Sequence, residues 1–279
     1  MIKTILWLTA FGPVSSFADV SLPGCSGALF RMPGMSNSDK ALIITAGHCS
    51  QIGSHIIPIT GSIVPDRGEY FSYSKTDSIR YHIHKNFVYN YKTYYYEDVV
   101  FSTMTTSDIA IIQTEFTYKY LLDNGYRIFK LSTEPPRLGQ ILRVLNFSIF
   151  KETNCKVNGI APLVLEQQWF FNNMIRVEND GTNCSLLPGS SGSPGVDLDG
   201  DIISGIVSTG ESGKNPPCSI NNPCEPNSNK KGEYLEFNFR PAYLTPVHQL
   251  YQCWSSSEKR FNFEIPGCQY SEQKISTKI

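Results

Sequence analysis

The sequence predicts an all-β protein of antiparallel strands, arranged as a sandwich or a barrel. Short segments rich in β-branched and aromatic residues recur along the chain, separated by Gly, Pro, Asn and Ser. No internal repeat is visible, and no long segment with helical periodicity dominates. We expect strands at 41–45, 55–59, 109–112, 141–145 and 202–207.

The charge balance and composition exclude several classes of protein. The 279 residues include 24 Lys and Arg against 25 Asp and Glu, which lacks the basic excess that nucleic-acid binding requires. With 41% hydrophobic and 18% charged residues, the chain does not have the composition of a disordered protein. No apolar run reaches the length of a membrane-spanning helix. We therefore expect a soluble, monomeric protein that binds neither nucleic acid nor a membrane.

Residues 1–18 have the pattern of a secretory signal peptide. Lys3 precedes a short apolar stretch at 5–11, and the small residues within 16–18 fit a signal-peptidase site. An uncleaved anchor is the alternative, but the stretch is too short to cross a bilayer. We expect a mature chain that begins at Asp19 and is secreted or periplasmic.

The cysteine count predicts four disulfides. An even number of cysteines in an exported chain favours disulfides, because the destination is oxidising. Zinc binding needs close pairs of the C-x-x-C kind, and the closest pair here is separated by five residues. The eight cysteines are Cys25, Cys49, Cys155, Cys184, Cys218, Cys224, Cys253 and Cys268.

The best internal boundary is the proline-containing segment 132–136, which interrupts the strand pattern. It divides the mature chain into a first half, 19–131, and a second half, 132–254, followed by a tail at 255–279. The tail is polar except around Cys268, which we expect to tether it.

Two further segments stand out in the second half. Residues 209–232 are rich in Gly, Pro, Asn and Ser, which indicates a long loop pinned by a cystine of its own. Residues 246–254 begin with Pro and have apolar residues at helical spacing, so we expect a short C-terminal helix there.

Three segments together indicate nucleophilic catalysis. TAGHC at 45–49 ends an apolar strand, SDIAII at 107–112 places an acid before another, and PGSSGSP at 188–194 is a glycine- and serine-rich turn. Singly, each has a plain structural interpretation: a satisfied polar side chain, a capping residue and a flexible loop. In combination they offer a hydroxyl, a base to take its proton and an acid to orient that base.

The chain order of these residues argues against one fold that uses the same chemistry. An α/β-hydrolase would place its serine first, within Gly-x-Ser-x-Gly. Here the histidine and the acid come first, and position 193 is serine rather than glycine.

The motifs resemble those of chymotrypsin-like (trypsin-fold) serine peptidases. TAGHC resembles the family's Thr-Ala-Ala-His-Cys, and DIAII at 108–112 resembles its Asp-Ile-Ala-Leu-Leu. GSSGSP at 189–194 is closest to the form found in bacterial glutamyl-endopeptidase-like relatives. Further matches at 25–29, 205–208 and 243–247 extend the resemblance over most of the mature chain.

The resemblance implies a fold and a set of roles. The fold would be two six-stranded antiparallel β-barrels with the active site between them, and 19–254 would form one peptidase domain. Ser191 would be the nucleophile, His48 the general base and Asp108 its orienter. The backbone N–H groups of Gly189 and Ser191 would form the oxyanion hole.

The resemblance also bears on the disulfides. It implies that Cys25 pairs with Cys49, and it makes Cys155 with Cys184 a reasonable second pair. Proximity in the sequence alone suggests the remaining two pairs, Cys218–Cys224 and Cys253–Cys268.

The chain departs from the family's pattern in two places. Trypsin-type members carry Asp before the nucleophile, where it pairs with a freed N-terminal ammonium, but this chain has Ser190. We therefore expect no activation switch of that kind. The substrate pocket, expected at Ser185, Val207, Ser208 and Gly210, has no charge-selecting residue, which favours a neutral or apolar P1 residue.

The sequence thus predicts a secreted serine endopeptidase that acts on polypeptides without a cofactor or metal. His82 and His84 share a face of a strand and could bind metal, but without a third ligand nearby the structural interpretation is favoured. The alternative function is a catalytically silent homologue that serves as a binding or adhesion module. Such homologues usually lose a triad residue, and none is missing here.

Overall fold

The structure, a computed structural model, describes part of the chain in detail. The described residues are 18–22, 24–50, 80–85, 94–104, 106–146, 151–167, 169–199, 201–211, 215–263 and 265–270. Residues 1–17 of the expected signal peptide and the strand expected at 55–59 lie outside this set, as do the side chains of His82 and His84. Among the helices in these ranges, none has both the length and the apolar character needed to cross a membrane.

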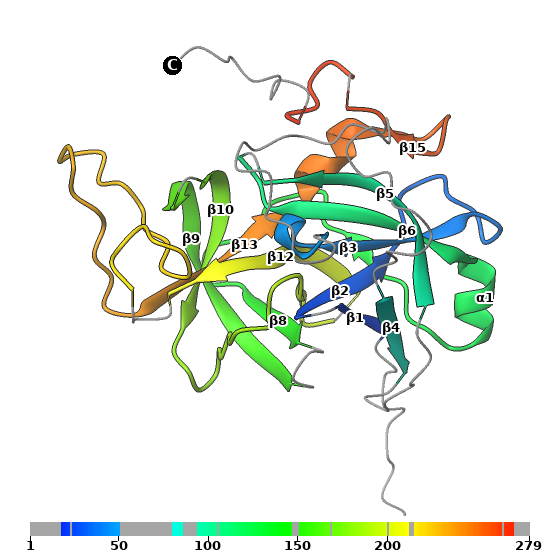
Figure 1. Cartoon of the computed structure of the whole chain (residues 1–279), viewed down its shortest axis with the longest axis horizontal. Coiled ribbons are helices and arrows are strands. Elements are labelled where there is room, and N and C mark those ends of the chain that lie inside the picture. The colour runs from blue at the N-terminus through cyan, green and yellow to red at the C-terminus, as the bar shows by residue number, and fades with distance from the viewer. Residues whose placement is uncertain are drawn as a thin grey trace, which may run out of the picture.

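The first half of the chain forms a closed six-stranded antiparallel barrel (Figure 1). Its strand order is β1-β2-β3-β6-β5-β4. The strands are β1 (Ala18–Leu22), β2 (Cys25–Phe30), β3 (Lys40–Thr45), β4 (Arg80–Lys85), β5 (Tyr94–Thr103) and β6 (Ile109–Thr117). β2 is buried throughout and β3 in all but its first residue, as expected for strands rich in Ile, Leu and Ala that line a barrel interior. This part of the predicted fold is confirmed.

The second half forms a seven-stranded sheet. Its order is β11-β8-β9-β10-β13-β12-β7, and β11 also pairs with β12. The strands are β7 (Lys130–Leu131), β8 (Ile141–Asn146), β9 (Lys151–Glu166), β10 (Trp169–Asn179), β11 (Pro194–Val196), β12 (Ile202–Gly210) and β13 (Arg240–Pro246). β7 precedes the expected boundary at 132–136, yet it pairs in parallel with β12 of this sheet.

The helices are short. The chain has one α-helix, α1 (Tyr118–Asp123), among the described residues, and Thr117 caps it by accepting a hydrogen bond from the backbone N–H of Tyr120. The expected C-terminal helix is present as the 3₁₀-helix η2 (His248–Cys253). Its N-cap residue, Val247, has no side-chain oxygen to satisfy the first N–H groups.

The segment after η2 packs into the protein core. β14 (Trp254–Ser255) pairs with β15 (Arg260–Phe261). The ring of Phe263 stacks on Phe101 of β5 at 4.1 Å, and Tyr270 lies 5.2 Å from the same ring. Residues 255–270 therefore contribute buried aromatic side chains to the core as well as being tethered at Cys268.

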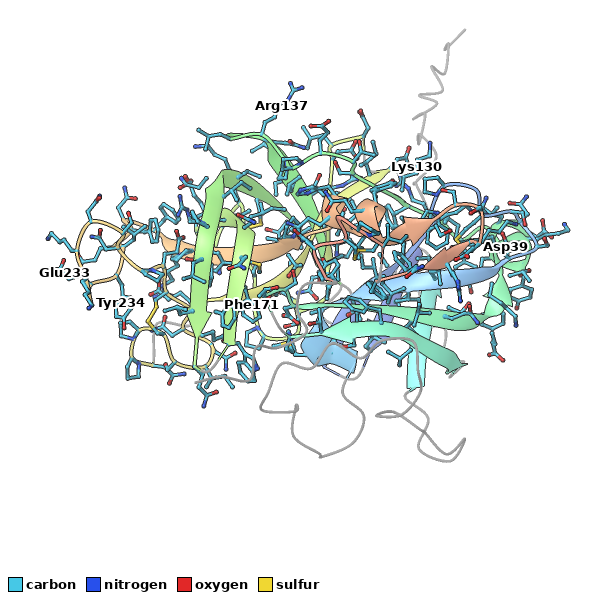
Figure 2. All side chains as sticks on the ribbon, turned by 90° about the horizontal axis from the view of Figure 1, so that it is seen from above. Asp39, Lys130, Arg137, Phe171, Glu233 and Tyr234 are labelled. Carbon is cyan, nitrogen blue, oxygen red and sulfur yellow. A yellow bond between two sulfur atoms is a disulfide. The ribbon has the colours of Figure 1, made fainter. Side chains whose placement is uncertain are left out.

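All four expected disulfides are present. The pairs are Cys25–Cys49, Cys155–Cys184, Cys218–Cys224 and Cys253–Cys268. The third of these closes a small ring within the expected 209–232 loop. Beyond that ring the chain continues into an arm that carries Tyr234, which lies at the opposite end of the molecule from Asp39 (Figure 2).

Candidate active site

His48 lies directly after a buried strand of the first barrel. β3 ends at Thr45, and the chain turns into the 3₁₀-helix η1 (Gly47–Ser50), whose second residue is His48. The disulfide between Cys25 and Cys49 ties this turn to the start of β2. The side chain of His48 is 28% exposed, so the imidazole borders solvent while the backbone around it is fixed.

Asp108 holds His48 through both of its carboxylate oxygens. Oδ2 lies 2.8 Å from Nδ1 of His48, and Oδ1 accepts a hydrogen bond of 2.9 Å from the backbone N–H of His48. The hydroxyl of Ser208 on β12 donates to Oδ2 over 2.6 Å. Because Nδ1 faces a carboxylate, it carries the proton of the neutral ring, which leaves Nε2 as the acceptor.

Burial and pairing act in opposite directions on these two groups. Burial alone lowers the pKa of His48, but the charge and hydrogen bond of Asp108 outweigh it, and the pKa lies above 6.5. Burial alone raises the pKa of Asp108, but His48 and the hydroxyl of Ser208 outweigh it, and the pKa lies below 3.8. The carboxylate is therefore ionised at neutral pH, and the imidazole keeps its proton to a higher pH than an isolated imidazole does.

Ser191 lies in a tight turn pressed against the first barrel. Its carbonyl oxygen accepts a hydrogen bond of 2.7 Å from the backbone N–H of Ser26 on β2. Gly192 has a φ of 79°, and a Cβ there would lie 2.0 Å from the carbonyl oxygen of Ser26 and 2.2 Å from Oγ1 of Thr45. Glycine is thus required beside Ser191 because the turn packs against the strand end that leads to His48.

Gly189, on the other side of Ser191, also requires glycine, since its φ is 93°. The backbone N–H of Ser191 donates no hydrogen bond to another residue of the described segments.

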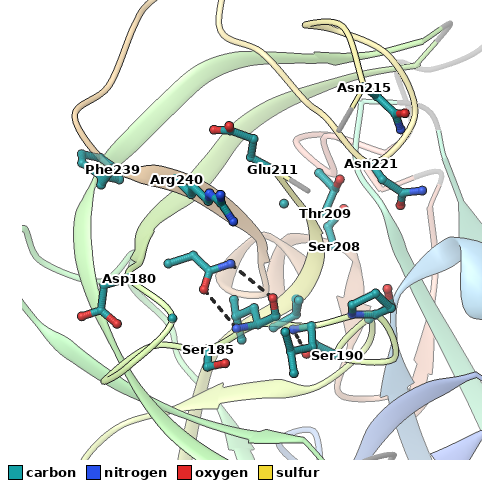
Figure 3. Close-up of a pocket in the computed structure, with 18 of the residues that line it drawn as sticks. Asp180, Ser185, Ser190, Ser208, Thr209, Glu211, Asn215, Asn221, Phe239 and Arg240 are labelled. Carbon is teal, nitrogen blue, oxygen red and sulfur yellow. Dashed lines mark hydrogen bonds between the residues drawn. The ribbon is translucent and has the colours of Figure 1, made fainter. Parts of the chain in front are cut away.

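A cavity of about 860 Å³ opens beside this turn (Figure 3). Ser191 lines it, as do all four residues expected from the sequence to form the substrate pocket: Ser185, Val207, Ser208 and Gly210. Ser185 and Val207 are buried, and neither side chain carries a charge, so the part of the pocket that they form is uncharged. Through Ser208, the wall of the cavity reaches the carboxylate of Asp108.

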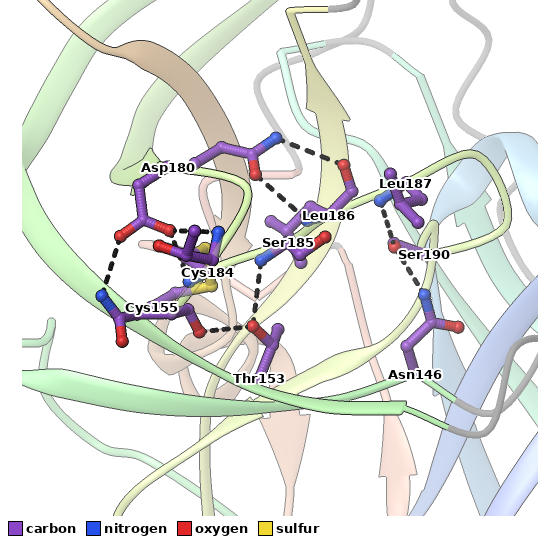
Figure 4. The surroundings of a disulfide bond; sticks show 12 residues. Asn146, Thr153, Cys155, Asp180, Cys184, Ser185, Leu186, Leu187 and Ser190 are labelled. Atoms are coloured by element: carbon purple, nitrogen blue, oxygen red, sulfur yellow. Dashed lines mark hydrogen bonds between the residues drawn. A yellow bond between two sulfur atoms is a disulfide. The ribbon is translucent and has the colours of Figure 1, made fainter.

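A disulfide-braced turn, shown in Figure 4, contributes Asp180 and Ser185 to the lining of the cavity. Cys184 is bonded to Cys155 of β9. The carboxylate of Asp180 accepts hydrogen bonds from the backbone N–H groups of Cys184 and Thr182, which lower its pKa. Asp180 is thus held within its own turn, and its ionised carboxylate is exposed on this side of the cavity.

Two charged residues line the cavity although no pattern in the sequence predicts them there. Glu211 follows β12, and Arg240 begins β13. Their side chains form no ion pair with other residues in the described ranges, and Arg240 extends towards the interior of the pocket (Figure 3). Only the long-range pairing of β12 with β13 brings them to one rim.

A buried acid also lies near the site, and no pattern in the sequence predicts it. Glu166, at the end of β9, is 7% exposed and accepts a hydrogen bond of 2.6 Å from the backbone N–H of Asn221, which lines the cavity. The Thr209 side chain also hydrogen-bonds Glu166. Burial is the largest cause of the raised pKa of Glu166, and its charge raises the pKa of His48.

The one group of potential metal ligands within the described residues does not suit a metal ion. It comprises Cys25, His48 and Cys49. Both sulfurs are joined in a disulfide and so offer no thiolate.

Known proteins similar to this chain were found among solved structures. No protein-family model and no curated protein matches the sequence. The Nocardiopsis protease has a TM-score of 0.45 at 12% identity, over 88% of this chain and 96% of that chain. A glutamic acid specific serine protease that utilizes a histidine triad in substrate binding has a TM-score of 0.44 at 15% identity, over 83% and 93%. Cellulomonas bogoriensis chymotrypsin has a TM-score of 0.43 at 14% identity, over 87% and 94%.

Proposed function

We propose that the chain is a secreted serine endopeptidase that cleaves polypeptides through an acyl-enzyme. The observation that carries this proposal is the hydrogen-bonded series from Ser208 to Asp108 to His48, at the edge of a cavity lined by Ser191. A carboxylate that orients an imidazole is the first part of the arrangement that activates a hydroxyl nucleophile, and the described contacts supply it in Asp108 and His48. The approach of the His48 ring to the Ser191 hydroxyl is part of the proposal.

The proposed reaction begins with His48 neutral and Asp108 ionised. Nε2 of His48 takes the proton of the Ser191 hydroxyl as Oγ attacks the substrate carbonyl carbon. The imidazolium, stabilised by Asp108, then gives this proton to the leaving amine, and the peptide C–N bond breaks. Water next attacks the acyl-enzyme, with His48 again acting as base, and releases the acid product and free Ser191.

The turn around Ser191 supports the stabilisation of the developing oxyanion. In the proposed mechanism the backbone N–H groups of Gly189 and Ser191 donate to that oxygen. Donors fixed in place before the reaction need no reorganisation when the charge forms, which is why such groups lower the barrier.

The substrate pocket supports a preference for a neutral or apolar P1 side chain. Ser185 and Val207 are uncharged and buried. Glu211 and Arg240 line the cavity with opposite charges, and neither belongs to the buried surface that Ser185 and Val207 form.

The proposal extends to architecture and location. The pairing of β11 with β12 supports a second six-stranded barrel, with β7 as an added strand, so that 19–254 forms one domain with its site between the barrels. Four disulfides support folding in an oxidising compartment, outside the cell or in the periplasm.

Labelling with a fluorophosphonate tests the proposal. We expect the wild type to be labelled, Ser191→Ala to remain unlabelled, and turnover of that variant to fall on the order of 10⁶-fold. A wild type that is folded and fully oxidised but unlabelled would instead support the catalytically silent binding module.

A further inference from the structure

The loop that carries Ser191 is held by a neutral side-chain pair at its buried end. We propose that Asn146 and Ser190 are positioning residues that keep the Gly189–Ser191 turn ready for catalysis, without a contribution from the chain's N-terminal amino group. This inference rests on the proposed function, because it concerns the amide groups expected to bind the oxyanion.

The contacts of the Ser190 hydroxyl carry the argument (Figure 4). Nδ2 of Asn146 donates to Oγ of Ser190 over 2.6 Å, and the backbone N–H of Leu187 donates to the same oxygen over 2.9 Å. The relative exposure of Asn146 is 1% and that of Ser190 is 2%. A hydroxyl oxygen accepts two hydrogen bonds, so these donors use its full accepting capacity.

The backbone of Ser190 closes the same turn. Its N–H donates to the carbonyl oxygen of Leu187 over 2.9 Å, and its carbonyl oxygen accepts from the N–H of Ser193 over 2.9 Å. The peptide that follows Ser190 carries the N–H of Ser191, and the peptide that precedes Ser190 begins at Gly189. A rotation of Ser190 would therefore reorient the Ser191 amide directly and would displace Gly189, which carries the other amide proposed for the oxyanion hole.

Asn146 is a suitable anchor because it ends a strand of the sheet. It is the last residue of β8, and it pairs with Lys151 of β9. Ser190 is thus held in place by a strand of the sheet and not by an end of the chain.

The N-terminal strand is committed elsewhere. β1 pairs on one side with β2 and on the other with β4, and Asp19, the expected first residue of the mature chain, pairs with Ala28 and His84. The β1 residue that pairs with Ser26 is Ser21, about 7 Å along the strand from Asp19 at 3.3 Å per residue. An amino group at Asp19 would have to leave both strand pairings to approach Ser190.

Kinetics of side-chain variants test the pair. We expect Asn146→Ala and Ser190→Ala each to lower kcat by about 10- to 100-fold, with KM changed less than about threefold, because misplaced oxyanion donors cost mainly transition-state binding. The kcat of the double variant should be no lower than that of the less active single variant, since the two side chains act as one unit. Single-variant kcat within threefold of wild type, or losses that multiply in the double variant, would overturn the proposal.

A matched control uses an asparagine outside the cavity lining. Asn158 on β9 donates from Nδ2 to Glu178 over 2.8 Å, and we expect Asn158→Ala to leave kcat unchanged. Near-UV circular dichroism and a count of free thiols show whether each variant folds.

A second test uses the wild-type sequence and does not depend on the variants folding. An α-amino group loses its charge near pH 7.7–8.0, so a loop that depended on it would lose activity above about pH 8. We expect kcat/KM to stay level from pH 8 to about 9.5, and a form extended by a few residues before Asp19 to keep full activity. A tenfold loss in either measurement would overturn the proposal, whereas a wild type that a fluorophosphonate does not label would instead contradict the proposed function.

Discussion

Oδ2 of Asp108 accepts a hydrogen bond of 2.6 Å from the hydroxyl of Ser208 and lies 2.8 Å from Nδ1 of His48. One carboxylate oxygen thus joins β12 of the second sheet to the turn after β3 of the first barrel. Ser208 also lines the cavity beside Ser191. The orientation of the imidazole therefore depends on how the two halves of the chain pack.

Removing the Ser208 hydroxyl tests this link. We expect Ser208→Ala to lower kcat/KM about tenfold, because a hydrogen bond to a charged group contributes about 1.5–3 kcal/mol and part of it orients His48. Ser204, buried on the same strand, offers a matched control, and Ser204→Ala should change kcat/KM less than twofold. Equal losses in the two variants would indicate a general weakening of β12 rather than a loss at Asp108.

The pH dependence of activity follows from the raised pKa of His48. The base must be neutral to accept a proton, so kcat/KM should rise with pH and reach half its maximum above pH 6.5. Asp108→Asn removes the charge that raises this pKa, so the midpoint should move to lower pH while kcat falls about 10⁴-fold. A midpoint that does not move would show that Asp108 does not set the protonation of His48.

The raised pKa of His48 also predicts how the free energy of unfolding changes with pH. The His48 pKa is raised on folding, so its pairing with Asp108 stabilises the folded state fully below about pH 6.5. This contribution declines as the pH rises through the folded-state pKa. Urea unfolding at pH 6 and pH 9 should show a smaller difference between wild type and Asp108→Asn at the higher pH, and a larger difference there would contradict the assignment.

Glu166 should tune the base without taking part in the reaction. Its charge raises the pKa of His48, so Glu166→Gln should move the midpoint of the pH profile to lower pH and change the maximal kcat less than about threefold. Gln keeps an oxygen that can accept the hydrogen bond from Asn221. A midpoint shifted to higher pH would show that the carboxylate acts on the site in another way.

The two rim charges should act in opposite directions on substrate choice. Arg240→Ala leaves Glu211 unopposed, so cleavage after Lys or Arg should rise about fivefold relative to cleavage after neutral residues. Glu211→Gln should raise cleavage after Asp or Glu to a similar extent. Both effects should diminish in 0.5 M salt because the rim is exposed to solvent. A peptide-library profile that changes in the same direction in both variants would contradict this account.

The residues around His48 and Asp108 could be predicted because local sequence determines their placement. In each case an apolar strand adjoins a single polar residue, so the strand pattern fixes where the side chain emerges. The need for glycine at position 192, in contrast, is a finding of the structure, because the packing against Ser26 and Thr45 leaves no space for a side chain.

The remaining features depend on long-range pairing that no local pattern records. Glu166 and Arg240 are isolated charged residues, and only the partners of β9 and β13 decide whether they face solvent or the cavity. The short strand β7 precedes the expected boundary but joins the second sheet. Phe263 is one of a few aromatic residues in a polar segment, and its burial against Phe101 became evident only in three dimensions.

Trapping of the acyl-enzyme tests the central claim most directly. The wild type is mixed with a p-nitrophenyl ester, quenched in acid within milliseconds, digested and analysed by mass spectrometry. We predict a burst of one equivalent of nitrophenol and one acyl group on the peptide that contains Ser191, with neither present in His48→Ala. An acyl group on another residue, or hydrolysis that proceeds equally well without His48, would contradict the account.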